Sequence, residues 1–311
     1  MANTNKKSIL VVGSIGLDSI ASPAGKVENT LGGSANYFSI AASLFSSVAM
    51  VGVVGEDYDA KYFSLLKKHD IDYSGVRVEK GETFRWSGSY VEDLNEAVTL
   101  KTELNVFRNF NPELKKSHRD FEYLFLANID PVLQLRVLDQ MSAPKFVGLD
   151  TMNYWIDSKL SDLKKVLKRV DAFLLNETEA LKISEESNIV NAAKKLVELG
   201  PKIVVIKRGE YGFFMYHDEQ YFILPAFPIS NVIDPTGAGD SFAGGFMGYL
   251  AQQNFLLKDK NANRTLRQAC VFGTIVASFS VQDFGVTALA RVKSGDIEAR
   301  FNEYSKVITL E

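Results

Sequence analysis

Short apolar runs alternate with amphipathic stretches along most of this chain. The apolar runs predict buried strands at 8–13, 48–54, 123–127, 145–150, 172–175 and 202–207. Apolar residues at helical spacing predict helices at 33–45, 57–69, 132–141, 158–169 and 189–199. A strand pair is predicted at 213–217 and 220–224, followed by long helices at 238–252 and 265–281. This alternation is typical of an α/β fold, in which a mostly parallel sheet has helices on both faces.

Two stretches break the alternation. The stretch 18–30 is short and contains Pro23 and Gly25, whereas 83–107 has the period-two pattern of strands. One face of the first of these strands carries Phe84, Trp86, Gly88 and Tyr90, and the other carries Arg85, Ser87 and Ser89. We predict that the two stretches form a small β lid over a site. The alternative is a set of extra strands at the edge of the main sheet, where exposed aromatic residues would serve packing.

The composition is that of an ordinary globular protein. The chain has 311 residues, of which 46% are hydrophobic and 23% charged, and a net charge of −3. We therefore expect one domain over 1–311 and no nucleic-acid partner held mainly through phosphates. Cys270 is the only cysteine, which excludes an intrachain disulfide. Because no long apolar segment or signal-peptide core is present, we expect a cytoplasmic protein with no membrane partner.

A glycine-rich turn lies at the start of the helix predicted over 238–252. It reads Asp234-Pro-Thr236-Gly237-Ala238-Gly239-Asp240. The glycines let the backbone curl, so that the amides of Ala238, Gly239 and Asp240 can point out of the first helical turn. Such amides form an anion site at the positive end of the helix dipole. A carboxylate there suits a general base that takes a proton from a hydroxyl while the amides stabilise phosphoryl charge. The alternative is that Asp240 caps the helix.

Near the N-terminus, residues suited to hydroxyl binding occur in order. Gly32 and Gly33 allow a sugar to approach the backbone, and Asn36 can both donate and accept hydrogen bonds. Asp18, just after the first strand, could accept bonds from two hydroxyls. The segment Gly52-Val-Val-Gly55-Glu-Asp57 lies further along the chain, at the end of the strand predicted over 48–54, and belongs to the same set of motifs. Taken singly, Asp18 could be a turn residue and Asn36 a helix-surface residue.

Two further segments follow predicted strands in the second half of the chain. Asn176-Glu-Thr-Glu179 comes directly after the strand at 172–175, and Lys207-Arg-Gly209-Glu-Tyr-Gly212 after the strand at 202–207. The first also fits a helix capping box, and the second fits a surface lysine with hairpin glycines. A Walker phosphate motif is absent, and the three histidines lack the spacing of a zinc site.

Together these motifs closely resemble the ribokinase-like (PfkB) carbohydrate kinase family, from about residue 11 to residue 285. The resemblance implies a ribokinase-like fold, with Asp240 as catalytic base and the 237–240 amides as anion hole. It implies that Asp18, Gly32, Gly33 and Asn36 hold the acceptor, beneath a lid that includes Phe84 and Trp86. Asn176, Lys207, Gly209 and Gly212 would lie on the ATP side. Glu179 would organise Mg²⁺ through water, and Asp234 and Thr236 match a loop that binds K⁺ in many members.

This family pattern is incomplete at one strand end. Asp150-Thr-Met-Asn-Tyr-Trp155 lacks the arginine often found just after it in the family, so charge compensation would rest on amides, Mg²⁺ and Lys207. The resemblance places adenine between the late strands and the helix that contains residues 263–278.

We therefore predict an ATP-dependent kinase that phosphorylates a hydroxymethyl group of a sugar. A nucleoside kinase is the alternative, because aromatic lid residues could stack on a base as well as on a sugar ring. A third reading is a ligand-binding regulator without catalysis. Two chains could pair through the lid as a homodimer. The acceptor and the hydroxyl that is phosphorylated are left open by the sequence.

Overall fold

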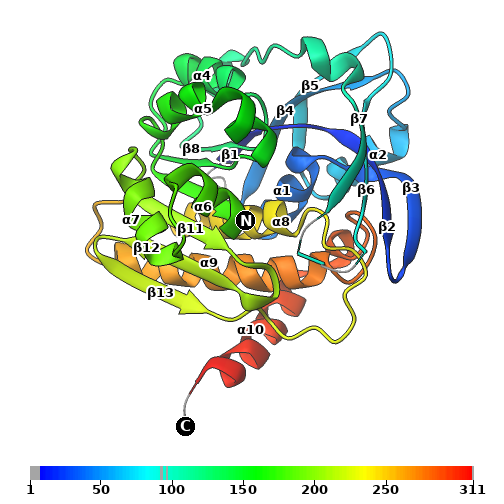
Figure 1. Cartoon of the computed structure of the whole chain (residues 1–311). Helices are drawn as coiled ribbons and strands as arrows, with labels where there is room; N and C mark the ends of the chain where they lie inside the picture. The colour runs from blue at the N-terminus through cyan, green and yellow to red at the C-terminus, as the bar shows by residue number, and fades with distance from the viewer. Residues whose placement is uncertain (1–7, 92–93, 96, 310–311) are drawn as a thin grey trace, which may run out of the picture.

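The computed structural model describes residues 8–91, 94–95 and 97–309, and its centre is a nine-stranded sheet (Figure 1). The strand order is β13-β12-β11-β10-β9-β8-β1-β4-β5. Neighbouring strands are parallel from β11 to β5, whereas β12 is antiparallel to both of its neighbours. The bounds are β1 Ser8–Val12, β4 Ser47–Gly55, β5 Asp72–Glu79, β8 Tyr123–Leu126, β9 Phe146–Leu149, β10 Ala172–Asn176, β11 Ile203–Lys207, β12 Phe213–His217 and β13 Gln220–Leu224.

Helices cover both faces of this sheet, as the sequence predicted. One face packs against α1 Ser34–Ser43, α2 Ala60–Lys68, α8 Ala238–Gln252 and α9 Ala262–Ser280, with α10 Ser294–Ile308 outside α9. The other packs against α4 Pro131–Gln140, α5 Asn153–Leu167, α6 Glu177–Ser184 and α7 Ile189–Glu198. Short helical turns are α3 Lys116–Arg119, η1 Asn105–Asn109, η2 Gly209–Tyr211 and η3 Leu289–Arg291. Within β1, Ile9 and Val11 join the first core and Leu10 and Val12 the second, so the strand is buried on both sides.

The two irregular stretches form a separate four-stranded sheet of order β3-β2-β6-β7, which we call the lid. Its strands are β2 Gly16–Ser22, β3 Gly25–Gly32, β6 Phe84–Ser89 and β7 Val98–Glu103. The prediction of a small β subdomain is confirmed, and the alternative of extra edge strands on the main sheet is wrong. β2 pairs with β6 in parallel, with Asp18 opposite Trp86, so these two side chains leave the same face of the lid.

Helices α1 and α8 run side by side in the same direction and approach closely. Gly237 meets Tyr37, Gly244 meets Phe38 and Ala41, and Gly248 meets Ala42 and Phe45. A Cβ at Gly244 would lie 2.5 Å from the backbone oxygen of Phe38 and 2.6 Å from the Cβ of Ala41. Glycine is therefore required for this spacing. Because the helices are parallel, their N-termini lie at the same end of the pair.

We predict that Gly244→Ala destabilises the protein by about 1–3 kcal/mol, because the added methyl group overpacks the α1–α8 contact. The measurement is urea denaturation. Gly295→Ala is the matched control, since a Cβ at this position in α10 meets no atom within 4 Å. It should leave the free energy of unfolding unchanged or raise it slightly through helix propensity. Equal effects of the two substitutions would contradict the prediction.

Candidate active site

The Gly237–Asp240 turn forms the N-terminus of α8. Gly237 is the N-cap residue, with the left-handed φ of 73° that favours glycine, and Asp240 is the third residue of the helix. The alternative that Asp240 is the N-cap is therefore wrong. The N–H of Ala238 donates to the backbone oxygen of Pro235 at 3.1 Å. The amides of Gly239 and Asp240 donate to no backbone oxygen among the residues that the structure describes, so these two amides remain for an anion.

The C-terminal ends of three neighbouring strands place further site residues beside this turn. Asp150 follows β9, Asn176 ends β10 and Lys207 ends β11, with Asn176 directly opposite Lys207 in the sheet. The Lys207 ammonium lies 2.8 Å from Oδ2 of Asp150. It also lies 3.0 Å from the point that a Cβ on Gly239 would occupy. The lysine therefore connects the strand ends to the amides of the turn.

The carboxylates of this cluster hold their protons unusually strongly. Burial, together with the charge of Asp150, raises the pKa of Asp240 to about 7, although Lys207 opposes the shift. Burial and Asp150 also raise the pKa of Glu179 to about 8, again against Lys207. For Lys207, burial favours the neutral form, but Asp150 and Glu179 outweigh it and raise its pKa. A carboxylate with a pKa near neutrality is suited to general-base chemistry.

Asn176 and Glu179 form a complete capping box at the start of α6. The Glu179 N–H donates to Oδ1 of Asn176, and the Asn176 N–H donates to Oε2 of Glu179, both at 2.8 Å. The capping alternative is therefore confirmed. It is compatible with a role near phosphates, because the capped turn holds the Glu179 carboxylate within the electrostatic reach of Asp150, Lys207 and Asp240.

The acceptor residues predicted near the N-terminus also come together. The Asp18 carboxylate is buried against Gly32, where a Cβ would lie 1.9 Å from Oδ2. Gly33 has a φ of 86° and is the N-cap residue of α1. Burial raises the pKa of Asp18 to about 7, with smaller contributions from Asp234 and Asp240, while a hydrogen bond with the backbone of Gly33 opposes the shift. Asn36 is fully buried and donates through Nδ2 to the backbone oxygen of Gly32 at 2.6 Å.

Asp234 holds two loops together. Its two carboxylate oxygens accept N–H groups of Thr236 and Gly285, both at 2.9 Å. The Thr236 hydroxyl lies 3.1 Å from the hydroxyl of Tyr90, which follows lid strand β6. The predicted lid residue Tyr90 therefore reaches the loop that precedes the anion site. Binding of K⁺ by Asp234 and Thr236 stays a prediction.

The aromatic residues predicted for acceptor binding have packing partners in or next to the lid. The Phe84 ring packs 5.5 Å from the Phe107 ring, between centroids, and also lies against Gly16. Trp86 lies along Gly88, and its indole N–H donates to Oγ1 of Thr99 at 3.2 Å. Phe84 thus contributes to packing at the lid base. Contact of either ring with an acceptor stays a prediction.

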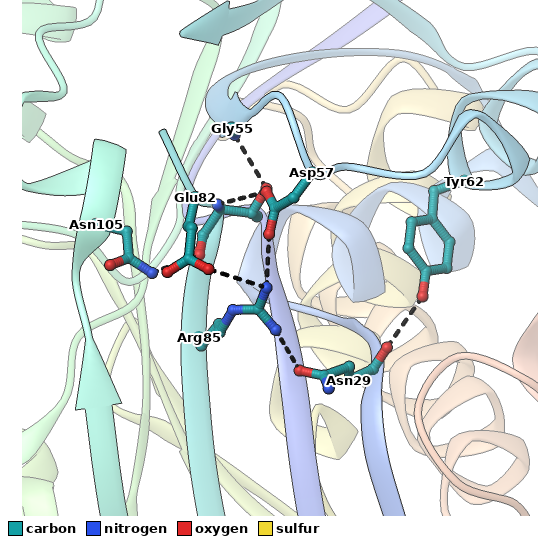
Figure 2. Close-up of polar contacts among 8 residues, drawn as sticks. Asn29, Gly55, Asp57, Tyr62, Glu82, Arg85 and Asn105 are labelled. Atoms are coloured by element: carbon teal, nitrogen blue, oxygen red, sulfur yellow. Dashed lines mark hydrogen bonds and ion pairs between the residues drawn. The ribbon is translucent and has the colours of Figure 1, made fainter. Parts of the chain in front are cut away.

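A polar cluster at the base of the lid connects it to the end of β4, and we call it the lid clasp: Gly55, Asp57, Thr83 and Arg85. Asp57 accepts from the backbone N–H of Thr83 at 2.7 Å, and from the Thr83 hydroxyl and Arg85 at 2.6 Å each. The Thr83 hydroxyl in turn accepts the N–H of Gly55 at 3.0 Å. Figure 2 shows Arg85 between Asp57 and Asn29, to which it also donates. The sequence indicated Gly55 and Asp57 but not their partners, because the contact joins segments that are 26 to 28 residues apart.

The loop at the tip of the lid reaches the segment after β11. Oδ1 of Asn95 accepts the N–H of Glu210 at 3.3 Å and lies 1.7 Å from the point that a Cβ on Gly209 would occupy. Gly209 has a φ of 55° and Gly212 a φ of 86°. A Cβ on Gly212 would lie 2.0 Å from the backbone oxygen of Leu224. Both glycines are therefore required by the local backbone and packing, as the alternative of hairpin glycines implied. Their predicted approach to ATP would be an additional role.

No three His, Cys, Asp or Glu side chains of the described residues converge on a point that could hold a metal. The described helices include none that is long and apolar enough to cross a membrane.

A family model described as pfkB family carbohydrate kinase matches residues 6–292. The chain belongs to the pfkB family of carbohydrate kinases. The predictions of a ribokinase-like fold and of an ATP-dependent kinase are thereby confirmed.

Known proteins support this assignment. The chain is 30% identical over 249 residues to a cytidine kinase of Thermococcus kodakarensis, covering 78% of this chain and 88% of the relative. The nucleoside kinase of Methanocaldococcus jannaschii has a similar structure, with a TM-score of 0.75 and 20% identity over 96% of this chain and 99% of that one. An E. coli protein proposed to be ribokinase II, in complex with ATP and Mg²⁺, gives a TM-score of 0.76 and 18% identity with the same coverage.

The lid clasp yields a stability prediction. Thr83→Val keeps the shape of the side chain but leaves the buried N–H of Gly55 without its acceptor, which should cost about 1–3 kcal/mol of unfolding free energy. Thr102→Val, on the exposed strand β7, is the matched control and should change stability by less than about 0.5 kcal/mol. Chemical denaturation measures both. A Thr83→Val protein as stable as the control would contradict the clasp.

The raised pKa of Asp240 gives a prediction of pH dependence. In the unfolded chain the carboxyl ionises near pH 4, whereas in the folded chain it ionises at about pH 7. Its contribution to stability is therefore complete below about pH 4 and is lost as the pH rises through 7. Asp240→Asn cannot ionise, so its Tm relative to the wild type should rise between pH 4.5 and pH 8. Thermal unfolding at both pH values checks this, and a constant Tm difference would refute it.

Proposed function

We propose that this pfkB-family kinase transfers the γ-phosphoryl group of ATP to a hydroxymethyl group of a sugar bound beside Asp18. The observation that carries the proposal is a pair of carboxylates, buried Asp18 and half-buried Asp240, each with a pKa of about 7 and within electrostatic reach of the other. One suits hydrogen bonding to acceptor hydroxyls, and the other lies in the first turn of α8 with unused amides.

In the proposed reaction Asp240 accepts the proton of the acceptor hydroxyl as the oxygen attacks the γ-phosphorus. The amides of Gly239 and Asp240, at the positive end of the α8 dipole, stabilise charge on the transferred group. Lys207, next to Gly239, adds a positive charge on the same side. The lid excludes water from the acceptor, which limits hydrolysis of ATP.

A divalent cation fits the side chains around Lys207, where the phosphates of ATP are proposed to bind; we call this region the phosphate side. Asp150, Glu179 and Asp240 are oxygen donors, and only Lys207 opposes their charge in this group. Mg²⁺ prefers oxygen ligands and keeps several of its waters, so Glu179 and Asp150 would hold it through water. When bound, it would neutralise charge on the phosphates of ATP. The E. coli structure that contains ATP and Mg²⁺ supports this assignment. Both Asp234 oxygens already accept backbone N–H groups, so a K⁺ ion at this loop would need other ligands as well.

A nucleoside is the second candidate acceptor. The cytidine kinase relative favours it, and Trp86 leaves the same lid face as Asp18, where an indole ring could stack on a base. A panel of D-ribose, D-fructose, cytidine and adenosine, tested for acceptor-dependent ADP formation, separates the two classes. Turnover of nucleosides alone would replace the sugar proposal. Pairing of two chains through the lid also stays a prediction, and exposed Val98 and Leu100 on edge strand β7 support it.

The assigned role of Asp240 predicts a specific kinetic loss. Asp240→Asn should lower kcat by roughly two or more orders of magnitude, because the base is lost, while the Kd for an ATP analogue changes little. Asp296→Asn is the matched control, since Asp296 is likewise the third residue of a helix, α10, and it should keep wild-type turnover. Full activity of Asp240→Asn would rule out its role as the base.

A further inference from the structure

Tyr37 is a buried residue beside the Gly237–Asp240 turn, and the proposed mechanism does not use it. It follows Asn36 in the first turn of α1 and is 1% exposed. Its ring lies directly against Gly237, where a Cβ would come within 2.3–2.4 Å of three ring carbons. The ring therefore supports the turn that carries the anion site. This contact accounts for the ring but not for the hydroxyl group.

The Tyr37 hydroxyl has no hydrogen-bond partner among the described residues. Two other buried tyrosines do have one: Tyr123 donates to the backbone oxygen of Phe255 at 3.0 Å, and Tyr304 donates to that of Pro225 at 2.5 Å, whereas the hydroxyl of buried Tyr58 also lacks one. An unpartnered buried hydroxyl costs about 1–3 kcal/mol, which phenylalanine at this position would avoid. A partner supplied by a ligand would offset this cost.

The groups around Tyr37 indicate the kind of ligand that would supply this hydrogen-bond partner. Burial and then the charges of Asp18, Asp234 and Asp240, with the hydroxyl of Tyr90, raise the pKa of the Tyr37 phenol. The hydroxyl thus keeps its proton and lies within electrostatic reach of Asp18, Asp240 and the lid residue Tyr90. A neutral donor at this place can bind an oxygen without adding the positive charge that would lower the pKa of the base.

We propose that Tyr37 is an additional acceptor-binding residue, whose hydroxyl donates a hydrogen bond to a sugar oxygen of the acceptor between Asp18 and Asp240. This inference rests on the proposed placement of the acceptor beside Asp18. It also links the two halves of the site, because the residue that supports the anion-binding turn through its ring holds the acceptor through its hydroxyl. The acceptor is then aligned with the turn by one rigid side chain.

The test is Tyr37→Phe, which keeps the ring against Gly237 and removes only the hydroxyl. With D-ribose and cytidine as probes, kcat/KM for whichever probe the wild type turns over should fall about tenfold, while KM for ATP stays unchanged. Without acceptor, the Tm should be equal to or higher than that of the wild type, because an unpartnered hydroxyl is removed. The rise in Tm on adding that probe should become smaller than in the wild type.

Tyr123→Phe is the matched control, since it removes a buried hydroxyl that has a partner within the protein. It should lower the Tm and leave the acceptor kinetics unchanged. An unchanged kcat/KM in Tyr37→Phe, whatever its Tm, would overturn the inference while leaving the proposed function standing. A wild type that phosphorylates neither probe nor any other sugar or nucleoside would overturn both.

Discussion

The close parallel packing of α1 and α8 is the constraint on which the site depends. Glycines at 237, 244 and 248 let the two helices approach, and each helix begins at the site. α1 follows the Gly32-Gly33 turn, which touches Asp18, and α8 follows the Gly237 turn, which carries Asp240. Two helix N-termini therefore direct their positive ends to one region, where carboxylates gather and where the phosphates of ATP are proposed to bind. Any change in the spacing of the helices would separate the proposed acceptor residues from the proposed base.

The charge of the phosphate side explains why this region needs several kinds of compensation. Asp150, Glu179 and Asp240 all lie within electrostatic reach of Lys207, and ATP would bring further negative charge. Protonation of Glu179 and Asp240 near neutral pH reduces this repulsion in the free protein. Helix amides and a proposed Mg²⁺ would take over that role when ATP binds. Lys207 is already paired with Asp150, so this lysine alone does not compensate the negative charge of the other carboxylates and of ATP.

The sequence predicted most of the fold because its strands are short, apolar and bounded by turn residues. The hairpin β12–β13 and helix α8 have their predicted bounds. Strand β5 was not predicted, since it is an edge strand with a mixed polar pattern, and α6 was not, because it begins directly after β10. Helix α10 was also absent from the prediction.

The candidate site was predicted where its residues follow parallel strands, because such strand ends meet at one edge of the sheet. The pairs Asp57–Thr83 and Asn95–Glu210 could not be predicted. They depend on the path of the chain between distant segments, which local patterns do not encode. Tyr37 was missed because an aromatic residue within an apolar helix is expected to belong to the core.

The lid contacts the rest of the chain in unequal ways. The clasp at its base is a network with an ionic hydrogen bond, whereas Tyr90–Thr236 and Asn95–Glu210 are single neutral hydrogen bonds. The Ser22 hydroxyl at the end of β2 adds a third such bond, to the backbone oxygen of Ile233 at 2.6 Å. Each of these single bonds costs only about 1 kcal/mol to break, so the outer part of the lid would separate from the rest of the chain more readily than its base. Such an opening would admit the acceptor and release the product without disrupting the clasp.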